Sequence, residues 1–300
     1  MTAEEDGSER GPGLRTLPAV DRCLVMGVVN VTPDSFSDGG DWLDPDKAVK
    51  HGLELVRQGA DIIDVGGEST RPGAHRVSAA EELNRVLPVV TALAQAGTYV
   101  SIDTMRAEVA TEALAIGAAM VNDVSGGLAD SDMAAVIARA GVPYIVNHWR
   151  GHSADMYGPA VYGDVVAEVQ AELHDRVQAL LTVGVDRAQL ILDPGLGFAK
   201  LPEHNWKLLT SLDRIARLPG FPDPFPVLVA ASRKGFLSKL LADPDGQPRP
   251  FSRNDDATIA VTALAVAAGA RIIRVHAVPG NVDAVRVATR WRDECLAGTS

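Results

Sequence analysis

Short apolar segments, each about the length of one β-strand, recur along the chain and alternate with stretches of amphipathic, helix-like pattern. Each apolar segment ends in polar residues or glycine, as expected for a buried parallel strand that runs into a loop. The segments cover residues 23–30, 60–67, 98–104, 119–126, 143–149, 190–195, 227–232 and 271–277. Eight such strands joined by helices predict an α/β protein with a single (β/α)8 TIM barrel.

Helix signals occupy the segments between these strands. Helices are predicted over residues 44–58, 78–95, 106–116, 130–140 and 161–182. Asp or Ser caps the start of several of them, and Gly59, Gly97, Gly117, Gly141 and Gly184 close them. A doubly wound parallel sheet uses similar strands, so periodicity alone leaves that fold open. The strand count favours the barrel, and no G-x-G-x-x-G follows the first strand.

Length and composition are consistent with one large domain. The chain has 300 residues, of which 46% are hydrophobic and 22% charged, enough to bury a sizeable core. The acidic first segment has no apolar run, which excludes a secretory signal. We therefore predict a disordered tail over residues 1–20 and the barrel domain over residues 21–300.

The net charge and the two cysteines limit which classes of binding partner and which cellular compartment the sequence predicts. A formal net charge of −11 argues against a nucleic-acid partner. The longest run of small apolar residues, 257–270, is too short to span a bilayer, so no membrane partner is predicted. Cys23 and Cys295 have no spacing typical of a disulfide framework or a zinc site, so a reduced, cytoplasmic protein is expected.

Polar residues end every predicted strand. In a TIM barrel these ends meet at the C-terminal face, where active sites lie. A single polar strand end is most often a helix cap or a loop hydrogen bond, but eight of eight favour a functional site. The strand-end residues are Asn30, Asp64, Asp103, Thr104, Asn122, Asp123, Asn147, His148, Asp193, Ser232, Lys234, Arg274 and His276.

The residue types suggest a heterocyclic, phosphorylated ligand. A buried carboxylate needs a donor pair, so Asp103 and Asp193 suit a planar ring with adjacent N–H groups, and Asn122 could both donate and accept. Arg274 and His276 are two positions apart on one strand, so they face the same side and could clamp a phosphate. Lys234 lies at a predicted helix start, where it could attract an anion or a ring carbonyl.

Two loops and one histidine cluster are weaker candidates. The loops over residues 31–42 and 68–77 are long and polar, and they carry Phe36 and Arg71 where a lid would lie above the barrel mouth. They could equally be ordinary turns. His148 and His152 are close in sequence, but no Cys or carboxylate has a matching metal-ligand spacing, so a metal site there is not expected.

Seven motifs resemble those of the bacterial dihydropteroate synthase family, and they occur in the family's order over most of the chain. NVTPDSFSDGG and GGESTRPG are long and highly specific. The motifs are MGVVNVTPDSFSDGG (26–40), DVGGESTRPGA (64–74), SIDT (101–104), NDVSGG (122–127), LDPGLGFAK (192–200), SRKGF (232–236) and RVHAV (274–278).

The resemblance implies a barrel that joins 6-hydroxymethyl-7,8-dihydropterin pyrophosphate to p-aminobenzoate in folate biosynthesis. By position, Asn30 would contact Mg²⁺, and Arg274 and His276 would bind the pyrophosphate. The resemblance also implies a homodimer and two flexible loops that close over the site. The pterin would be held by Asp103, Asn122, Asp193 and Lys234 beside Phe198, and the closing loops would contribute Phe36, Asp38, Thr70, Arg71 and Pro72.

Two positions depart from the family pattern. Asn147 stands where the family usually has Met, and Gly235 stands where it often has Ser or Arg. The sequence leaves two other interpretations open: a pterin-binding methyltransferase domain, and a pterin-binding paralogue without turnover. The SRK and R-x-H elements argue against the first, and the intact motifs argue against the second.

Overall fold

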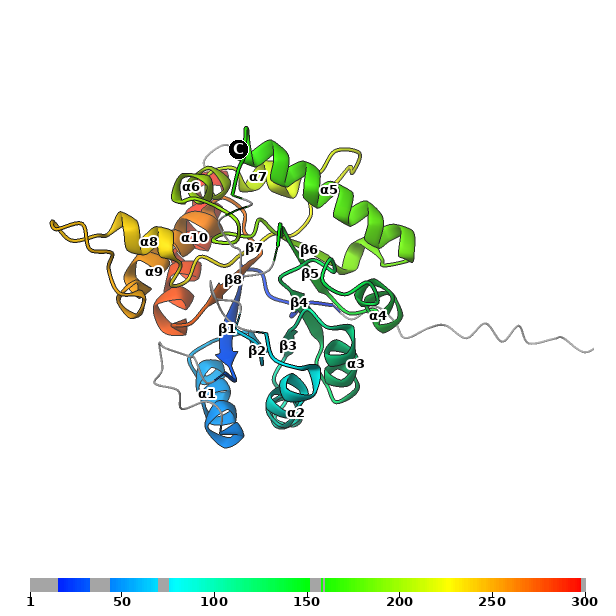
Figure 1. The fold of residues 1–300 in the computed structure, drawn as a ribbon. Coiled ribbons are helices and arrows are strands. Elements are labelled where there is room, and N and C mark those ends of the chain that lie inside the picture. Colours follow the sequence, from blue (N-terminus) through cyan, green and yellow to red (C-terminus); the bar gives the residue numbers. More distant parts are fainter. Residues whose placement is uncertain (1–15, 33–43, 70–75, 152–157, 159, 298–300) are drawn as a thin grey trace, which may run out of the picture.

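Eight parallel strands lie at the centre of the molecule and helices surround them (Figure 1). The computed structural model describes residues 16–32, 44–69, 76–151, 158 and 160–297. The strands are β1 Leu24–Asn30, β2 Ile62–Gly66, β3 Val100–Asp103, β4 Met120–Asp123, β5 Tyr144–Asn147, β6 Leu190–Asp193, β7 Leu228–Val229 and β8 Ile272–Val275. Each predicted strand is therefore found at its predicted place.

Ten α-helices are found in the described part of the chain, and most of them connect consecutive strands. They are α1 Pro45–Arg57, α2 Ala79–Gln95, α3 Ala107–Ala115, α4 Met133–Ala140, α5 Val165–Val183, α6 Pro202–Leu209, α7 Leu212–Ala216, α8 Gly235–Leu240, α9 Asp255–Ala267 and α10 Val278–Ala297. Two 3-10 turns, Arg187–Gln189 and Phe251–Arg253, precede β6 and α9.

The sheet closes on itself, which decides between the two folds that the sequence left open. Its strand order is β6-β5-β4-β3-β2-β1-β8-β7, and a parallel bridge between Leu192 and Val227 joins the two ends. The Leu192 N–H donates to the carbonyl of Pro226 at 2.9 Å at this closure. A closed ring of this order is the predicted TIM barrel and not a doubly wound sheet.

Alternation along the strands separates the barrel interior into a dry floor and a polar mouth. Side chains two apart on a strand face the same side, so one parity fills the interior. The interior apolar cluster consists of Leu24, Met26, Ile62, Met120, Ile145, Ile191, Leu228, Ala230 and Ile272. Two residues further along several of these strands the same face carries Asp64, Asn122, Asn147, Asp193, Ser232 and Arg274. The polar strand ends thus point into the barrel above a hydrophobic floor.

Most helix boundaries match their sequence signals. The Asp44 and Ser78 side chains accept from backbone N–H groups at the starts of α1 and α2. Helices α4 and α5 are exceptions, because they begin at Met133 and Val165 and not near residues 130 and 161 as predicted. Asp130 instead accepts from the Ala107 N–H at 2.8 Å, so this residue caps the neighbouring helix α3. An Asp that looks like the cap of the helix following it in sequence, α4, therefore caps the preceding helix, α3.

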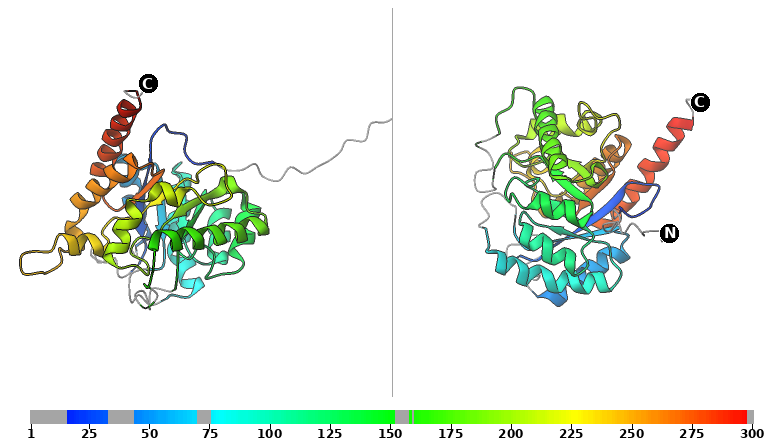
Figure 2. Two further views of the ribbon diagram at one scale, coloured as in Figure 1. Left: turned by 90° about the horizontal axis from the view of Figure 1, so that it is seen from above. Right: turned by 90° about the vertical axis from the view of Figure 1, so that its right-hand side faces the viewer.

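The first described residues cover the bottom of the barrel. Leu17 and Val20 pack against the interior apolar cluster, so packing begins within the segment predicted as a tail. Residues 1–15 lie outside the described part of the chain. At the other end of the sequence, the last turns of α10 project beyond the barrel (Figure 2). No helix in the described ranges is both long and apolar enough to cross a membrane.

The turn after β4 is held by one buried carboxylate. Asp123 accepts from the Ser125 N–H at 2.8 Å, the Ser125 hydroxyl at 2.7 Å and the Gly127 N–H at 2.8 Å. The hydroxyl of Tyr144 on the next strand donates to the same carboxylate at 2.8 Å. This network fixes the backbone directly after the site residue Asn122.

Replacing Tyr144 tests the contribution of this network. Tyr144→Phe removes a hydrogen bond to a buried carboxylate, so we expect the free energy of unfolding to fall by about 1.5–3 kcal/mol. The Tyr99 hydroxyl donates to carbonyls of Thr16 at 3.2 Å and Ala119 at 3.3 Å, in a more exposed place. Tyr99→Phe is therefore the matched control and should cost less in urea denaturation. Equal losses in the two variants would contradict the account.

Candidate functional site

An ion pair network that joins residues of β8, β2, β3 and β4 occupies one side of the barrel mouth. From β8, Arg274 donates through Nε to Asp64 Oδ2 of β2 at 2.6 Å and through a terminal nitrogen to Asp103 Oδ2 of β3 at 2.7 Å. The Asn122 amide of β4 donates to Asp64 Oδ2 at 2.8 Å. One guanidinium therefore bridges two carboxylates from two strands, a geometry that lysine could not reproduce.

Burial and charge act in opposite directions on these carboxylates. Asp64 is fully buried, and Asp103 lies largely inside the mouth. Burial raises the pKa of Asp103 to about 7, with Arg274 opposing this rise and Asp64 adding to it. The second oxygen of Asp64, Oδ1, has no hydrogen-bond partner within the described residues. The network thus holds one acceptor ready for a donor from a ligand.

The opposite side of the mouth pairs another carboxylate with a lysine. Asp193 is buried at the end of β6, and its Oδ1 accepts from the Gly195 N–H at 2.7 Å. Burial raises the pKa of Asp193, and the nearby Lys234 opposes this rise. Burial likewise lowers the pKa of Lys234 to about 8, with Asp193 opposing the change. At neutral pH Lys234 therefore remains the cation of this half of the site.

The loop of residues 195–200, which follows β6, fixes the position of Lys234. The Lys234 ammonium donates to the Leu196 carbonyl and lies 4.2 Å from the centre of the Phe198 ring. A Cβ atom added to Gly197 would lie 2.7 Å from Lys234 Cδ, so only glycine permits this approach. The structure thus brings together Asp193, Lys234 and Phe198, as the sequence predicted.

A serine and a histidine meet between β7 and β8. Ser232 Oγ lies 2.9 Å from His276 Nδ1 and accepts from the His276 backbone N–H at 3.2 Å. Arg233, between Ser232 and Lys234, has a positive φ of 56° and pairs with Asp255 at 3.0 Å. This left-handed residue sharply turns the chain out of the barrel, which separates Ser232 from Lys234.

Asn30 lies at the end of β1, on the rim beside the ion pair network. A Cβ on Gly66 would lie 3.7 Å from Asn30 Oδ1 and 3.6 Å from Asp103 Oδ2, so both oxygens approach the same glycine. The Asn30 amide oxygen suits Mg²⁺, which usually takes few protein ligands and completes its shell with water and phosphate oxygens, whereas Asp103 Oδ2 already accepts from Arg274. The described residues hold no group of three or more His, Cys, Asp or Glu that could bind a metal alone. The donor set therefore fits Mg²⁺ only together with a bound phosphate.

Asn147 lies on the same interior face and is paired in register with Asp193. Its residue surface is 6% exposed, and its Oδ1 has no partner in the described part of the chain. Gly195 passes so close that an added Cβ would lie 2.8 Å from this oxygen. The departure from the family's usual Met therefore places a polar atom in the mouth wall.

Several predicted site residues cannot be located. Phe36, Asp38, Thr70, Arg71 and Pro72 fall within 33–43 and 70–75, outside the described residues. Among the residues that are described, sequence reasoning gave no role to Asp64, although it ends the second predicted strand. Its role follows from Arg274 on β8 reaching past β1 to β2, and the wide separation of the two residues along the chain does not reveal this contact.

Comparison with known proteins places the chain in a family. A family model for pterin binding enzymes matches residues 26–276. The dihydropteroate synthase of Mycobacterium leprae is 52% identical over 268 residues, covering 89% of this chain and 93% of the relative. The chain belongs to the pterin-binding enzyme family.

Solved structures of family members share the barrel. The Yersinia pestis dihydropteroate synthase, solved with a sulfonamide drug complex, has a TM-score of 0.84 and 37% identity, covering 91% of this chain and 95% of its own. The Burkholderia cenocepacia enzyme, solved with 7,8-dihydropteroate, has a TM-score of 0.82 and 35% identity, covering 93% and 95%. These values confirm the family resemblance in the sequence and the predicted fold.

Removing the guanidinium tests the ion pair network. Arg274→Gln would leave Asp64 and Asp103 without their cation, so we expect the free energy of unfolding at pH 7.5 to fall by about 3–5 kcal/mol. Adding Asp64→Asn to this variant should recover part of the loss, because one buried charge disappears. The loss should also shrink at pH 5, below the pKa of Asp103, where that carboxyl is protonated.

Urea denaturation at both pH values measures these effects, with Arg139→Gln as the control because Arg139 is exposed on α4. A loss in Arg274→Gln no larger than in Arg139→Gln would contradict the network. A loss independent of pH would also contradict it, because protonation of Asp103 at pH 5 should weaken the ion pair that the variant removes.

Proposed function

We propose that this chain is a dihydropteroate synthase, a transferase of folate biosynthesis that joins 6-hydroxymethyl-7,8-dihydropterin pyrophosphate to p-aminobenzoate. The bond from the pterin methylene carbon to the pyrophosphate oxygen breaks, the amine nitrogen bonds to that carbon, and the amine loses a proton. The products are 7,8-dihydropteroate and pyrophosphate. The observation that carries the proposal is the buried Asp193 facing into the mouth beside Lys234, a pair suited to a polar heterocycle.

The described residues divide the recognition of the pterin between two halves of the mouth. Asp193 accepts from adjacent N–H groups of the ring, while Lys234 donates to a ring carbonyl or nitrogen. Asp64 Oδ1 supplies a further acceptor on the far wall, next to Asn122. The dry floor below strengthens these hydrogen bonds, because the local dielectric is low.

The leaving group requires positive charge near its oxygens. Arg274 and His276 supply donors from β8, and the electron-rich pterin supports positive charge that develops on its methylene carbon. Asn30, at the end of β1, would hold Mg²⁺ against the pyrophosphate. When bound, Mg²⁺ would neutralise charge on the departing pyrophosphate. Positioning and electrostatics therefore account for most of the chemistry.

Asp193→Asn tests pterin recognition. The amide presents donors to the ring N–H groups in place of a second acceptor oxygen, so pterin binding should weaken by about 1–3 kcal/mol. Calorimetry with the pterin pyrophosphate measures the change, and Asp213→Asn on the exposed face of α7 is the control. Unchanged affinity in Asp193→Asn would remove Asp193 from the site. Lack of pyrophosphate release by the wild-type protein with both substrates and Mg²⁺ would instead favour the paralogue without turnover.

Asn30→Ala tests the metal proposal. The variant should require a higher Mg²⁺ concentration for half-maximal pyrophosphate release, because one oxygen ligand is lost. Chelation with EDTA should stop the wild-type reaction, and added Mg²⁺ should restore it. A Mg²⁺ dependence identical in Asn30→Ala and the wild type would exclude Asn30 as a ligand.

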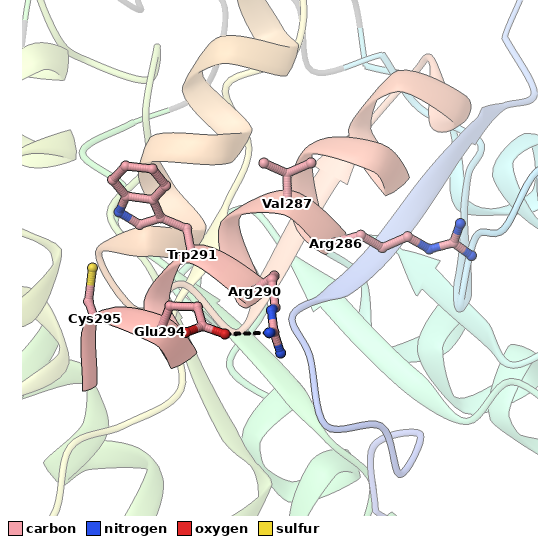
Figure 3. Close-up of a pocket in the computed structure, with 6 residues that line it drawn as sticks. All are labelled: Arg286, Val287, Arg290, Trp291, Glu294 and Cys295. Carbon is pink, nitrogen blue, oxygen red and sulfur yellow. Dashed lines mark ion pairs between the residues drawn. The ribbon is translucent and has the colours of Figure 1, made fainter. Parts of the chain in front are cut away.

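An exposed apolar face on α10 supports a homodimer as the partner. Figure 3 shows Val287 and Trp291 on this helix, and they are 66% and 70% exposed. They line an open hollow of about 700 Å³ together with Arg286, Arg290, Glu294 and Cys295. A patch that combines apolar side chains with both signs of charge suits the self-complementary contact of a two-fold dimer.

Trp291→Glu tests this contact. A charge at the centre of the apolar face should abolish dimer formation in sedimentation velocity at micromolar concentrations. Val183→Glu, at the end of α5, is the control because Val183 is also exposed but lies on another helix. A monomeric wild-type protein, or a Trp291→Glu variant that stays dimeric, would exclude this interface.

The compartment that we propose is the cytoplasm. Cys23 and Cys295 form no disulfide, and Cys23 is buried. Burial raises the pKa of the Cys23 thiol to about 12, so this thiol stays protonated and inert.

A further inference from the structure

A second buried lysine, which the proposed chemistry does not use, holds the 195–200 loop. Lys200 is 2% exposed, and its Nζ lies 3.0 Å from the Phe198 carbonyl and 2.9 Å from His148 Nδ1. A lysine ammonium has donors only, so both of these atoms must accept from it. Lys200 therefore ties the loop after β6 to the end of β5.

The contact with Glu172 determines the tautomer of His148. The Glu172 carboxylate can only accept, so the proton of the neutral ring is on Nε2, which donates to Glu172 Oε2 of α5 at 2.9 Å, and Nδ1 accepts from Lys200. Arg150 donates to the same Glu172 carboxylate at 3.1 Å. Three buried or half-buried groups thus form one continuous chain from helix α5 to the loop. His148, a weak metal candidate in the sequence, is used for this connection.

The charge states of His148 and Glu172 agree with the donor and acceptor roles described for them. Burial, with Lys200 beside it, lowers the pKa of His148 to about 4, so the ring is neutral at pH 7. Burial opposes ionisation of Glu172, but the hydrogen bonds from His148 and Arg150 outweigh it and lower its pKa to about 2. Burial lowers the pKa of Lys200 to about 7, and the nearby Asp193 opposes this shift.

The loop needs such a restraint because its backbone is unusual. Gly195 has φ +70° and Gly197 φ +77°, and Ala199 has φ +48° without being glycine. A non-glycine residue in this region is strained and persists only where neighbouring contacts enforce it. Ala199 lies between Phe198 and Lys200, and the Lys200 Nζ bonds back to the Phe198 carbonyl on the other side of it.

We propose, resting on the proposed function, that Lys200 is a positioning residue for pterin binding: anchored on His148, it sets the loop whose Leu196 carbonyl and Phe198 ring hold the Lys234 ammonium. Lys200 acts through Lys234 and does not touch the substrate. Its side chain is sequestered below the loop, while Lys234 is the cation directed at the mouth.

A double-mutant cycle on pterin affinity tests the proposal. Lys200→Met keeps the apolar stem and removes the ammonium, so the loop should lose its wild-type position. Pterin pyrophosphate with Mg²⁺ should then bind about 10-fold more weakly. This is the low end of the effect seen when a group that orients a metal ligand is removed. In a Lys234→Met background the same change should have no further effect. Lys207→Met, on the exposed face of α6, is the control and should bind as the wild type does.

Steady-state kinetics distinguish a role of Lys200 in positioning Lys234 from a general loss of active-site structure. Lys200→Met should raise KM for the pterin substrate and leave KM for p-aminobenzoate at saturating pterin unchanged. If Lys200→Met does not fold, His148→Leu replaces it in the same cycle, and His148→Gln, which can still accept from Lys200, should restore affinity.

Three results separate the possible failures. Wild-type pterin affinity in Lys200→Met would overturn the proposal while leaving the proposed function intact. Additive losses in the double variant would also overturn it, because they would show that Lys200 acts independently of Lys234. Failure of the wild-type protein to bind the pterin pyrophosphate would overturn the proposed function, and this inference with it.

Discussion

Three carboxylates directed into a low-dielectric barrel are the constraint on which the site depends. Asp64, Asp103 and Asp193 would each be costly to ionise there without compensation. Arg274 compensates the first two from across the barrel, and Lys234 opposes the shifted pKa of Asp193 on the other side. The mouth is therefore divided into a half in which Arg274 bridges two carboxylates and a half in which Lys234 lies near Asp193, each with acceptor capacity left for a ligand.

The sequence predicts the fold well because a single rule governs it. Apolar segments of strand length mark all eight strands, and alternation along each strand determines which polar residues face inward. The prediction that Arg274 and His276 share one side follows from that rule, and their contacts with Asp103 and Ser232 agree with it. Helix boundaries follow less directly from the sequence, because a residue with capping chemistry such as Asp130 can cap a neighbouring helix.

Contacts between distant strands could not be predicted. Asp64 was recognised as a strand end, but its pairing with Arg274 depends on barrel curvature and side-chain reach. Lys200 gave even less signal, because a lysine near a helix start normally lies at the surface. Only the packed structure shows that it is buried against His148. Residues that hold other residues in place are therefore harder to find from sequence than residues that face the ligand.

The loop after β6 connects the barrel mouth to helix α5 on the outside of the barrel. Its carbonyl and aromatic ring meet Lys234, while its own backbone is held by a chain of hydrogen bonds that ends on α5. A helix on the outside of the barrel thereby influences the position of a cation inside it. The glycines that permit this close packing at positions 195 and 197 have almost no space for a side chain.

A crystal structure of the protein soaked with the pterin pyrophosphate tests the central claim most directly. The account predicts that the pterin ring lies between the two halves of the mouth, with adjacent ring N–H groups within hydrogen-bond distance of the Asp193 carboxylate and Lys234 Nζ bonded to the ring. A ring bound elsewhere, or one that leaves Asp193 without a ligand donor, would contradict it.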